Sequence, residues 1–258
     1  MDKTLNIALV QSPLHWEDPE ANRKMFSERL EAIPNDVDLI ILPEMFTSGF
    51  TMHPENLDIS EGARTLGWMK EWAGNLNAAV TGSLVFNQSE QYFNRLFFVY
   101  PDGSYKSYDK KHTFTLAGED AAYTAGKEKV IMEYKEFKIC PLICYDLRFP
   151  VWARNAENYD ILIYVANWPQ PRIAAWDTLL KARAIENMAY CIGVNRIGAD
   201  GLGYEYPGHS AVYDVLGKQL AYSEKEDVLL VTLNKGHIMD TREKLKFLDD
   251  RDHFNLIG

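Results

Sequence analysis

Cysteine is scarce in this sequence, and no long apolar run occurs. The three cysteines, Cys140, Cys144 and Cys191, are too few and too scattered for a disulfide framework. No stretch approaches the roughly 18 consecutive apolar residues of a membrane-spanning helix. The N-terminal segment also lacks the apolar region and cleavage site of a secretory signal. We therefore expect a cytoplasmic protein with no membrane segment.

Positive charge is scarce as well. The chain has 27 Lys and Arg against 37 Asp and Glu, a net charge of −10, and its basic residues form no run. Nucleic acid is therefore not an expected partner, because phosphate-driven binding needs a basic face. The six histidines show no HExxH pattern or close His–Cys spacing, so the sequence predicts no metal site. An anionic small molecule can still bind in a locally positive pocket.

The chain has the composition of one ordinary globular domain. Its 258 residues are 47% hydrophobic and 25% charged, with no repeat and no Pro/Gly/Ser-rich linker. Short apolar runs alternate with longer amphipathic ones, and hairpins alternate with helix crossovers. This pattern predicts a single α/β domain over residues 1–258, with a mixed sheet covered by helices.

Periodicity and turn residues define the expected elements. Strands are predicted over residues 6–11, 37–42, 78–86, 92–100, 104–110, 129–134, 137–144, 160–166 and 190–196, with two or three more in 210–234. Helices are predicted over residues 18–32, 61–75, 151–158, 174–188 and 236–248.

Glu44 comes directly after an apolar strand that Pro43 ends. Ligands in α/β sheets usually bind beyond the carboxyl ends of strands. A carboxylate beside an apolar run there can act as a general base, because desolvation raises its pKa. A solvated loop glutamate is the alternative.

Lys110 ends the second strand of the predicted hairpin. A lysine at this place can hold a fixed positive charge where an oxyanion develops. A surface lysine in a charged stretch is the alternative. His112 follows two residues later, and a packed or supporting histidine is the simpler interpretation of it.

Cys144 stands where an apolar strand gives way to a polar segment. This placement resembles that of an elbow nucleophile, and nearby positive charge or backbone donors make a thiol reactive there. A small buried side chain is the alternative, and we assign that role to Cys140 and Cys191. Together, the three strand ends supply the acid, the cation and the thiol that hydrolysis through a thioester needs.

Three ordered motifs carry a family resemblance: LIILPEM around Glu44, YDKKHTF around Lys110 and CYDLRFP from Cys144. With ANWP at 166–169 and KARAIEN at 181–187, they resemble the nitrilase superfamily of carbon–nitrogen hydrolases over nearly the whole chain. Within it, the chain looks most like the omega-amidase branch, which hydrolyses the terminal amide of 2-oxo acids such as 2-oxoglutaramate. The resemblance implies a four-layer αββα sandwich of two mixed sheets, without metal or organic cofactor.

The resemblance also implies roles for the site residues. Cys144 would be the nucleophile, Glu44 the general base and Lys110 the oxyanion stabiliser, joined by a backbone N–H near Tyr145. A second glutamate often supports the family's triad, and Glu119 is the best match here, with Asp120 as the alternative.

A substrate carboxylate needs a fixed cation, and arginine suits it through bidentate hydrogen bonding. We expect Arg148, Arg172 or both to bind it, although either can instead be structural. The aromatic residues Phe114, Phe149 and Trp168 are expected to line the substrate site.

The sequence is also compatible with other functions. Another amidase of the superfamily, acting on N-carbamoyl amino acids or deaminated glutathione, or a nitrilase would use the same triad. A non-catalytic binding protein of the same fold is the competitor from another class, although it would not need an intact triad. The family resemblance further predicts a homodimer or higher homo-oligomer, for which Trp152, Tyr159 and Trp176 are candidate interface residues.

Overall fold

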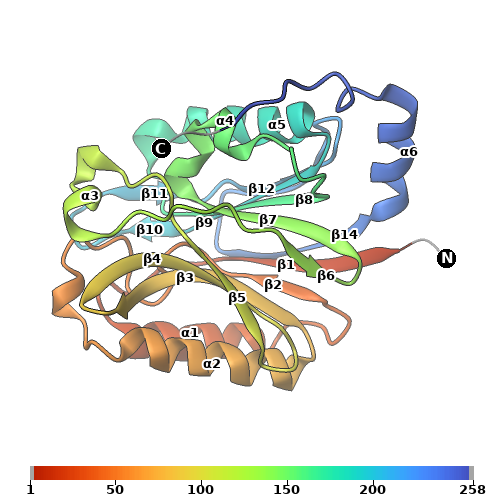
Figure 1. The fold of residues 1–258 in the computed structure, drawn as a ribbon. Coiled ribbons are helices and arrows are strands. Elements are labelled where there is room, and N and C mark those ends of the chain that lie inside the picture. The colour runs from red at the N-terminus through yellow and green to blue at the C-terminus, as the bar shows by residue number, and fades with distance from the viewer. Residues whose placement is uncertain (1–2, 256–258) are drawn as a thin grey trace.

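The computed structural model describes residues 3–255 and contains two six-stranded mixed sheets (Figure 1). The first sheet is formed by Thr4–Gln11 (β1), Leu39–Ile41 (β2), Ala79–Gln88 (β3), Gln91–Val99 (β4), Tyr105–Asp109 (β5) and Asp227–Asn234 (β14), in the order β14–β1–β2–β3–β4–β5. The second is formed by Met132–Tyr134 (β6), Phe137–Ile143 (β7), Ile161–Ala166 (β8), Tyr190–Asn195 (β9), Ser210–Tyr213 (β12) and Gln219–Ser223 (β13), in the order β13–β12–β9–β8–β7–β6. A separate hairpin pairs Ile197–Ala199 (β10) with Glu205–Pro207 (β11).

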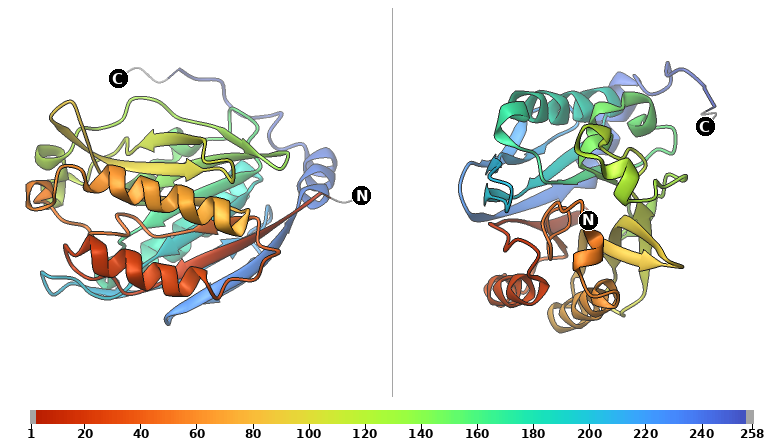
Figure 2. Two further views of the ribbon diagram at one scale, coloured as in Figure 1. Left: turned by 90° about the horizontal axis from the view of Figure 1, so that it is seen from below. Right: turned by 90° about the vertical axis from the view of Figure 1, so that its left-hand side faces the viewer.

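Helices cover the outer face of each sheet, which gives four layers (Figures 1 and 2). Pro19–Leu30 (α1) and Glu61–Leu76 (α2) cover the first sheet, and Pro150–Ala153 (α4) and Ile173–Asn187 (α5) cover the second. Glu119–Ala122 (α3) lies at one end of the sandwich and Lys235–Leu245 (α6) at the other. The predicted αββα sandwich of a single domain is therefore confirmed.

Local sequence explains where these elements begin and what they bury. α1 starts at Pro19 because the side chain of Asp18 accepts a hydrogen bond from the Ala21 N–H at 3.0 Å. α2 presents Leu66, Met69 and Ala73 to the first sheet at helical spacing. Burying a leucine or methionine side chain contributes about 1.5–3 kcal/mol.

The main core lies between the two sheets and has side chains from both. Leu5, Leu39 and Phe98 of the first sheet share it with Ile139 and Ile163 of the second, all fully buried. Cys140 and Cys191 are fully buried members of the same core, as predicted.

The predicted helix over residues 151–158 is wrong beyond Ala153. Asn155 is fully buried, and its side chain accepts from the Tyr159 N–H at 2.8 Å and donates to the Asn187 carbonyl at 3.0 Å. These side-chain bonds replace helical ones, and Asn158 then adopts a left-handed φ of 57°. The C-terminal helix likewise ends at Leu245 rather than residue 248, because Lys246 is left-handed, with φ 55°.

Three further differences concern strands and aromatic residues. The strand predicted over 129–134 forms only at Met132–Tyr134, and the β10–β11 hairpin was not predicted. Trp152, Tyr159 and Trp176 are buried in the core of the chain, so they present no interface.

Across the described residues, no helix is long and apolar enough to cross a membrane.

Candidate active site

The three predicted site residues meet at one end of the sandwich, where strands of both sheets terminate. Glu44 follows β2, Lys110 follows β5, and Cys144 directly follows β7. The Lys110 Nζ donates to Glu44 Oε1 at 2.9 Å. Asn167, after β8, links the thiol to the acid: its N–H donates to Glu44 Oε2 at 2.8 Å, and its carbonyl oxygen lies 3.9 Å from the Cys144 Sγ.

Glu119 completes a group that we call the carboxylate–lysine cluster: Glu44, Lys110 and Glu119. The Lys110 Nζ lies 2.9 and 2.8 Å from the two carboxylate oxygens of Glu119. All three side chains are at most 1% exposed. Asp120, the alternative from the sequence, is exposed on the outside of α3. Glu119 is thus the acid that lies beside Lys110.

Asn94 joins the two carboxylates and was not predicted from the sequence. Its Nδ2 donates to Glu44 Oε1 at 2.8 Å and to Glu119 Oε1 at 3.2 Å. In the sequence, Asn94 is distinguished only as a polar residue in a largely apolar strand, β4, where the structure buries it. Buried charges need such partners, because an unpaired one carries a large desolvation cost.

Burial and neighbouring charges set the protonation states. Burial, reinforced by the Glu44 carboxylate, raises the pKa of the Cys144 thiol well above its usual value. Burial would lower the pKa of Lys110, but the carboxylates of Glu119 and Glu44 outweigh it and raise that pKa. Burial also raises the pKa of Glu119. At neutral pH the site therefore holds a neutral thiol and a firmly charged lysine.

Cys144 sits on a strained turn, as an elbow nucleophile does. It has φ 43° and opens a 3₁₀ helix over Cys144–Arg148. The buried Asp146 carboxylate fixes this turn, because it accepts from the Ile143 N–H at 3.0 Å and the Tyr108 hydroxyl at 2.8 Å. It also accepts from the His112 N–H at 3.0 Å and lies 2.7 Å from the His112 Nδ1. His112 thus packs as a supporting residue next to the Lys110 segment.

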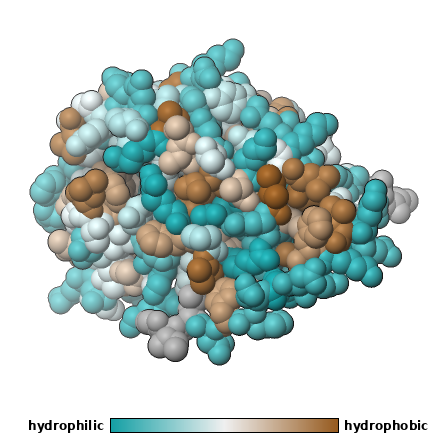
Figure 3. Space-filling model, turned by 90° about the horizontal axis from the view of Figure 1, so that it is seen from above, coloured by the Kyte–Doolittle hydropathy of each residue, from teal (hydrophilic) through white to brown (hydrophobic). Residues whose placement is uncertain are grey.

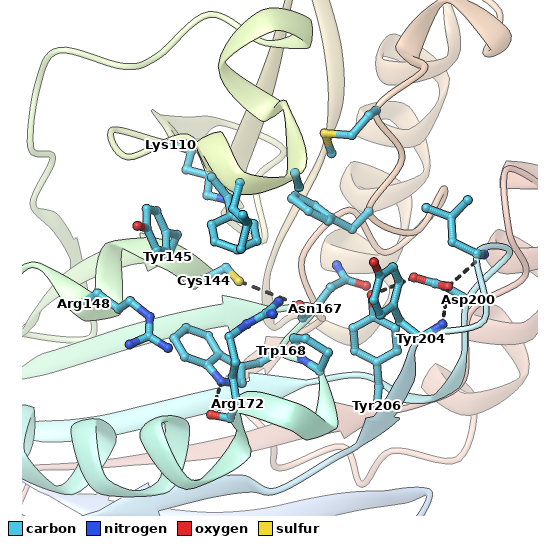
Figure 4. Close-up of a pocket in the computed structure, with 17 residues that line it drawn as sticks. Lys110, Cys144, Tyr145, Arg148, Asn167, Trp168, Arg172, Asp200, Tyr204 and Tyr206 are labelled. Atoms are coloured by element: carbon cyan, nitrogen blue, oxygen red, sulfur yellow. Dashed lines mark hydrogen bonds between the residues drawn. The ribbon is translucent and has the colours of Figure 1, made fainter.

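A cavity of about 350 Å³ opens above Cys144 (Figure 4). Of the residues predicted to bind substrate, it is lined by Phe114, Tyr145, Arg148, Trp168 and Arg172. Phe149 does not line it. Its ring stacks on His112 with 3.7 Å between centroids and meets the edge of Tyr145 at 5.1 Å, one layer behind the wall.

The far wall of the cavity was not predicted from the sequence. It is formed by the β10–β11 hairpin and the loop after β2, with Asp200, Leu202, Tyr204, Tyr206, Phe50 and Met52. The turn of the hairpin is rich in glycine, which sequence patterns assign to a loop. Within residues 3–255, no group of three or more His, Cys, Asp or Glu side chains is placed to hold a metal ion.

Comparison with known proteins decides the family. The carbon–nitrogen hydrolase family matches residues 6–243. The chain belongs to the carbon–nitrogen hydrolases. It is 42% identical to the omega-amidase YafV of Yersinia enterocolitica, covering 98% of this chain and 99% of that protein. It is 30% identical to a 2-oxoglutaramate amidase of Bacillus subtilis, covering 95% and 96%.

A solved structure gives the same result for this carbon–nitrogen hydrolase. XC1258 of Xanthomonas campestris, described as a CN-hydrolase superfamily protein with an arsenic adduct in its active site, superposes with a TM-score of 0.95. The two chains are 40% identical, and the match covers 99% of each. The family places its members among enzymes that hydrolyse carbon–nitrogen bonds, so the hydrolase is an enzyme of this class.

Proposed function

We propose that the hydrolase releases ammonia from the terminal amide of small 2-oxo acid amides, of the 2-oxoglutaramate or 2-oxosuccinamate type. The observation that carries this proposal is the carboxylate–lysine cluster beside the Cys144 thiol, below a cavity that also presents two arginines. The cluster suits amide hydrolysis, and the arginines suit a carboxylate. The names of the relatives from Yersinia enterocolitica and Bacillus subtilis support the same substrate class.

In the proposed first half-reaction, Cys144 attacks and ammonia leaves. Glu44 takes the thiol proton as the sulfur bonds to the amide carbon. The Lys110 ammonium and the Tyr145 N–H hold the resulting oxyanion. Tyr145 lies in the first turn of its 3₁₀ helix, where backbone N–H groups have no partner within the helix. The carbon–nitrogen bond then breaks, and the leaving nitrogen takes the proton from Glu44.

In the second half-reaction, water hydrolyses the thioester. Glu44 takes a proton from water as its oxygen bonds to the acyl carbon, and the same donors hold the second oxyanion. The carbon–sulfur bond breaks, the sulfur regains a proton from Glu44, and the carboxylic acid leaves. Glu119 acts as a positioning residue in this scheme, because its carboxylate holds the Lys110 ammonium at 2.8 Å.

The remaining cavity residues are proposed to bind the rest of the substrate. Arg148 and Arg172 would bind the distal carboxylate, and Phe114 and Trp168 would form apolar walls along the chain of the substrate. Phe149 contributes to this site only indirectly, by packing behind Tyr145.

The test is ammonia release across a panel of amides. It contains 2-oxoglutaramate, 2-oxosuccinamate, an N-carbamoyl amino acid, an aliphatic nitrile and a neutral amide of similar length. We expect the highest kcat/KM for the two 2-oxo acid amides. Equal efficiency with the neutral amide would rule out carboxylate recognition and, with it, the omega-amidase assignment.

We further propose that the chain forms a homodimer or higher homo-oligomer and acts in the cytoplasm. Exposed apolar side chains support association: Ile185 and Leu216 are 47% and 54% exposed, and Gly217 packs against Ile185. Figure 3 shows apolar groups on the face that carries α4 and α5. Light scattering at micromolar concentration checks the assembly, and a mass near 29.6 kDa would contradict it.

A further inference from the structure

Arg148 and Arg172, which we call the arginine pair, line the cavity, and among residues 3–255 their guanidinium groups have no hydrogen-bonded or ionic partner. The guanidinium carbon of Arg148 lies 5.1 Å from the Trp168 ring centroid, and that of Arg172 lies 5.1 Å from the Phe114 centroid. Among the described residues, no carboxylate lies within ion-pairing distance of either guanidinium. Contact with aromatic rings orients the two groups and leaves their N–H donors available to a ligand.

The other charges that line the cavity are already engaged. Lys110 is paired within the carboxylate–lysine cluster. Asp200 accepts from the N–H groups of Leu202 and Tyr204, each at 2.9 Å, and from the Tyr206 hydroxyl at 2.8 Å. Its carboxylate therefore holds its own turn together, and Figure 4 shows it across the cavity from Arg148. Of the charged side chains among residues 3–255 that line the cavity, the arginine pair therefore has no hydrogen-bonded or ionic partner.

We propose that the arginine pair selects the group at position 2 of the substrate, accepting a 2-oxo group and rejecting a 2-ammonium group. This inference rests on the proposed function. Glutamine and 2-oxoglutaramate have the same terminal amide, chain length and carboxylate, so the thiol and its cluster cannot distinguish them. One guanidinium binds the carboxylate, and the second faces the adjacent carbon. This second guanidinium donates a hydrogen bond to a ketone oxygen at position 2 and repels an ammonium group at the same position.

The repulsion is large enough to determine specificity. Two unit charges about 5 Å apart, at the effective dielectric constant of about 20 found near protein surfaces, correspond to roughly 10²-fold in kcat/KM. The aromatic walls provide no compensating carboxylate. Asp200 lies across the cavity from Arg148, and its oxygens accept three hydrogen bonds, from the N–H groups of Leu202 and Tyr204 and from the Tyr206 hydroxyl. Glutamine and other amino-acid amides compete for such a pocket. Because they carry the same terminal amide as the substrate, contacts to that amide cannot exclude them.

The experiment compares three amides of equal length in ammonia-release assays: 2-oxoglutaramate, the monoamide of glutaric acid and glutamine. The monoamide has no substituent at position 2 and serves as the reference. For the wild type we expect a kcat/KM for glutamine about 10²-fold below the reference. One of the two variants Arg148→Met and Arg172→Met removes the cation that faces position 2. In that variant, the ratio of kcat/KM for glutamine to kcat/KM for the reference monoamide should rise about tenfold or more.

Two further variants separate charge from other effects. The lysine variant at the same position keeps the cation, so it should keep the rejection of glutamine while binding the carboxylate less well. Arg64→Met, on the exposed face of α2 and away from the cavity, is the matched control and should leave all three values unchanged. An unchanged ratio of glutamine to reference in both methionine variants and in the double variant would overturn the inference.

The pH dependence gives a readout that a structural role would not move. As pH rises through the pKa of its amino group, glutamine loses its positive charge, so its kcat/KM relative to the reference should rise in the wild type. It should rise much less in the methionine variant. If Asp200 held the ammonium instead, Asp200→Asn would lower the use of glutamine relative to the reference, and the inference would be wrong.

The same assays distinguish this inference from the proposed function. A wild type that hydrolyses neither 2-oxoglutaramate nor the reference monoamide contradicts the proposed function. A wild type that hydrolyses all three amides equally well contradicts the selection by the arginine pair and leaves the amidase assignment intact.

Discussion

Two parts of the candidate active site, the carboxylate–lysine cluster and the arginine pair, hold their charges in opposite ways. The cluster, which we call the floor, reaches the cavity only through Lys110; its side chains are at most 1% exposed, and the Lys110 ammonium contacts both carboxylates. At the side wall, Arg148 is exposed and Arg172 half-buried, and their close contacts are aromatic rings. The floor residues follow sheet strands or lie on α3, whereas both arginines end short 3₁₀ helices.

Under the proposed function, this difference separates the residues that perform the chemistry from those that recognise the substrate. Buried charges must be paired, and their pairing fixes the donors before the oxyanion forms, so little reorganisation is needed during the reaction. Within the described residues the arginines have no ion pair to give up, so a substrate carboxylate would bind them directly under the proposed function. Substitutions at the floor should therefore change the rate and the stability, whereas those at the wall should change specificity.

The largest expected effect comes from removing the nucleophile. Cys144→Ala should abolish turnover, by about 10³-fold or more, because no other group can form the thioester. The fold should be preserved, since a small side chain replaces another at the end of β7. Steady-state ammonia release with near-ultraviolet circular dichroism checks both points. Activity within tenfold of the wild type would contradict the assignment of the nucleophile.

Removing the central cation should damage both rate and stability. Lys110→Met leaves Glu44 and Glu119 buried side by side, which costs about 3–5 kcal/mol of unfolding free energy. Loss of an oxyanion donor lowers kcat by about 10²–10³-fold. Urea unfolding and steady-state kinetics measure the two effects. An unchanged unfolding midpoint would show that the cluster does not stabilise the fold.

Removing the general base should slow acylation by about 10²-fold or more. In Glu44→Gln, the pKa of the Cys144 thiol should fall, because the carboxylate that helps raise it is gone. The thiolate should then appear at lower pH than in the wild type, although turnover is slower. Ultraviolet titration against Cys144→Ala follows the thiolate, and single-turnover assays follow acylation. Acylation at the wild-type rate would show that another residue is the general base, and Glu119 would be the first candidate.

The smallest expected effect on stability is at the wall. Arg172→Met should change the unfolding free energy by no more than about 0.5 kcal/mol, because it breaks no ion pair in the described structure. The KM for 2-oxoglutaramate should rise far more than kcat falls. Urea unfolding beside steady-state kinetics makes the comparison. A loss of stability as large as that of Lys110→Met would show that the cluster and the arginine pair do not differ in how they contribute to the stability of the fold.

The sequence allowed the floor to be predicted better than the wall. Glu44, Lys110 and Cys144 each follow a strand, so the topology of the sheets determines where they lie. The choice between Glu119 and Asp120 depends on which side of a four-residue helix faces inward, and periodicity cannot decide this over one turn. The wall depends on the β10–β11 hairpin, whose strands of three residues are too short to show alternation.

The site is shared between the two sheets. Glu44 and Lys110 follow strands of the first sheet, and Cys144 and Asn167 follow strands of the second. β14, the last strand of the described residues, pairs with β1 along eight residues, so the first sheet is complete only when the chain has been made as far as Asn234. During refolding, activity therefore cannot return before the two sheets have packed against each other, so its recovery reports that step. Two separately made halves of the chain would each be inert, and activity would return only on their association.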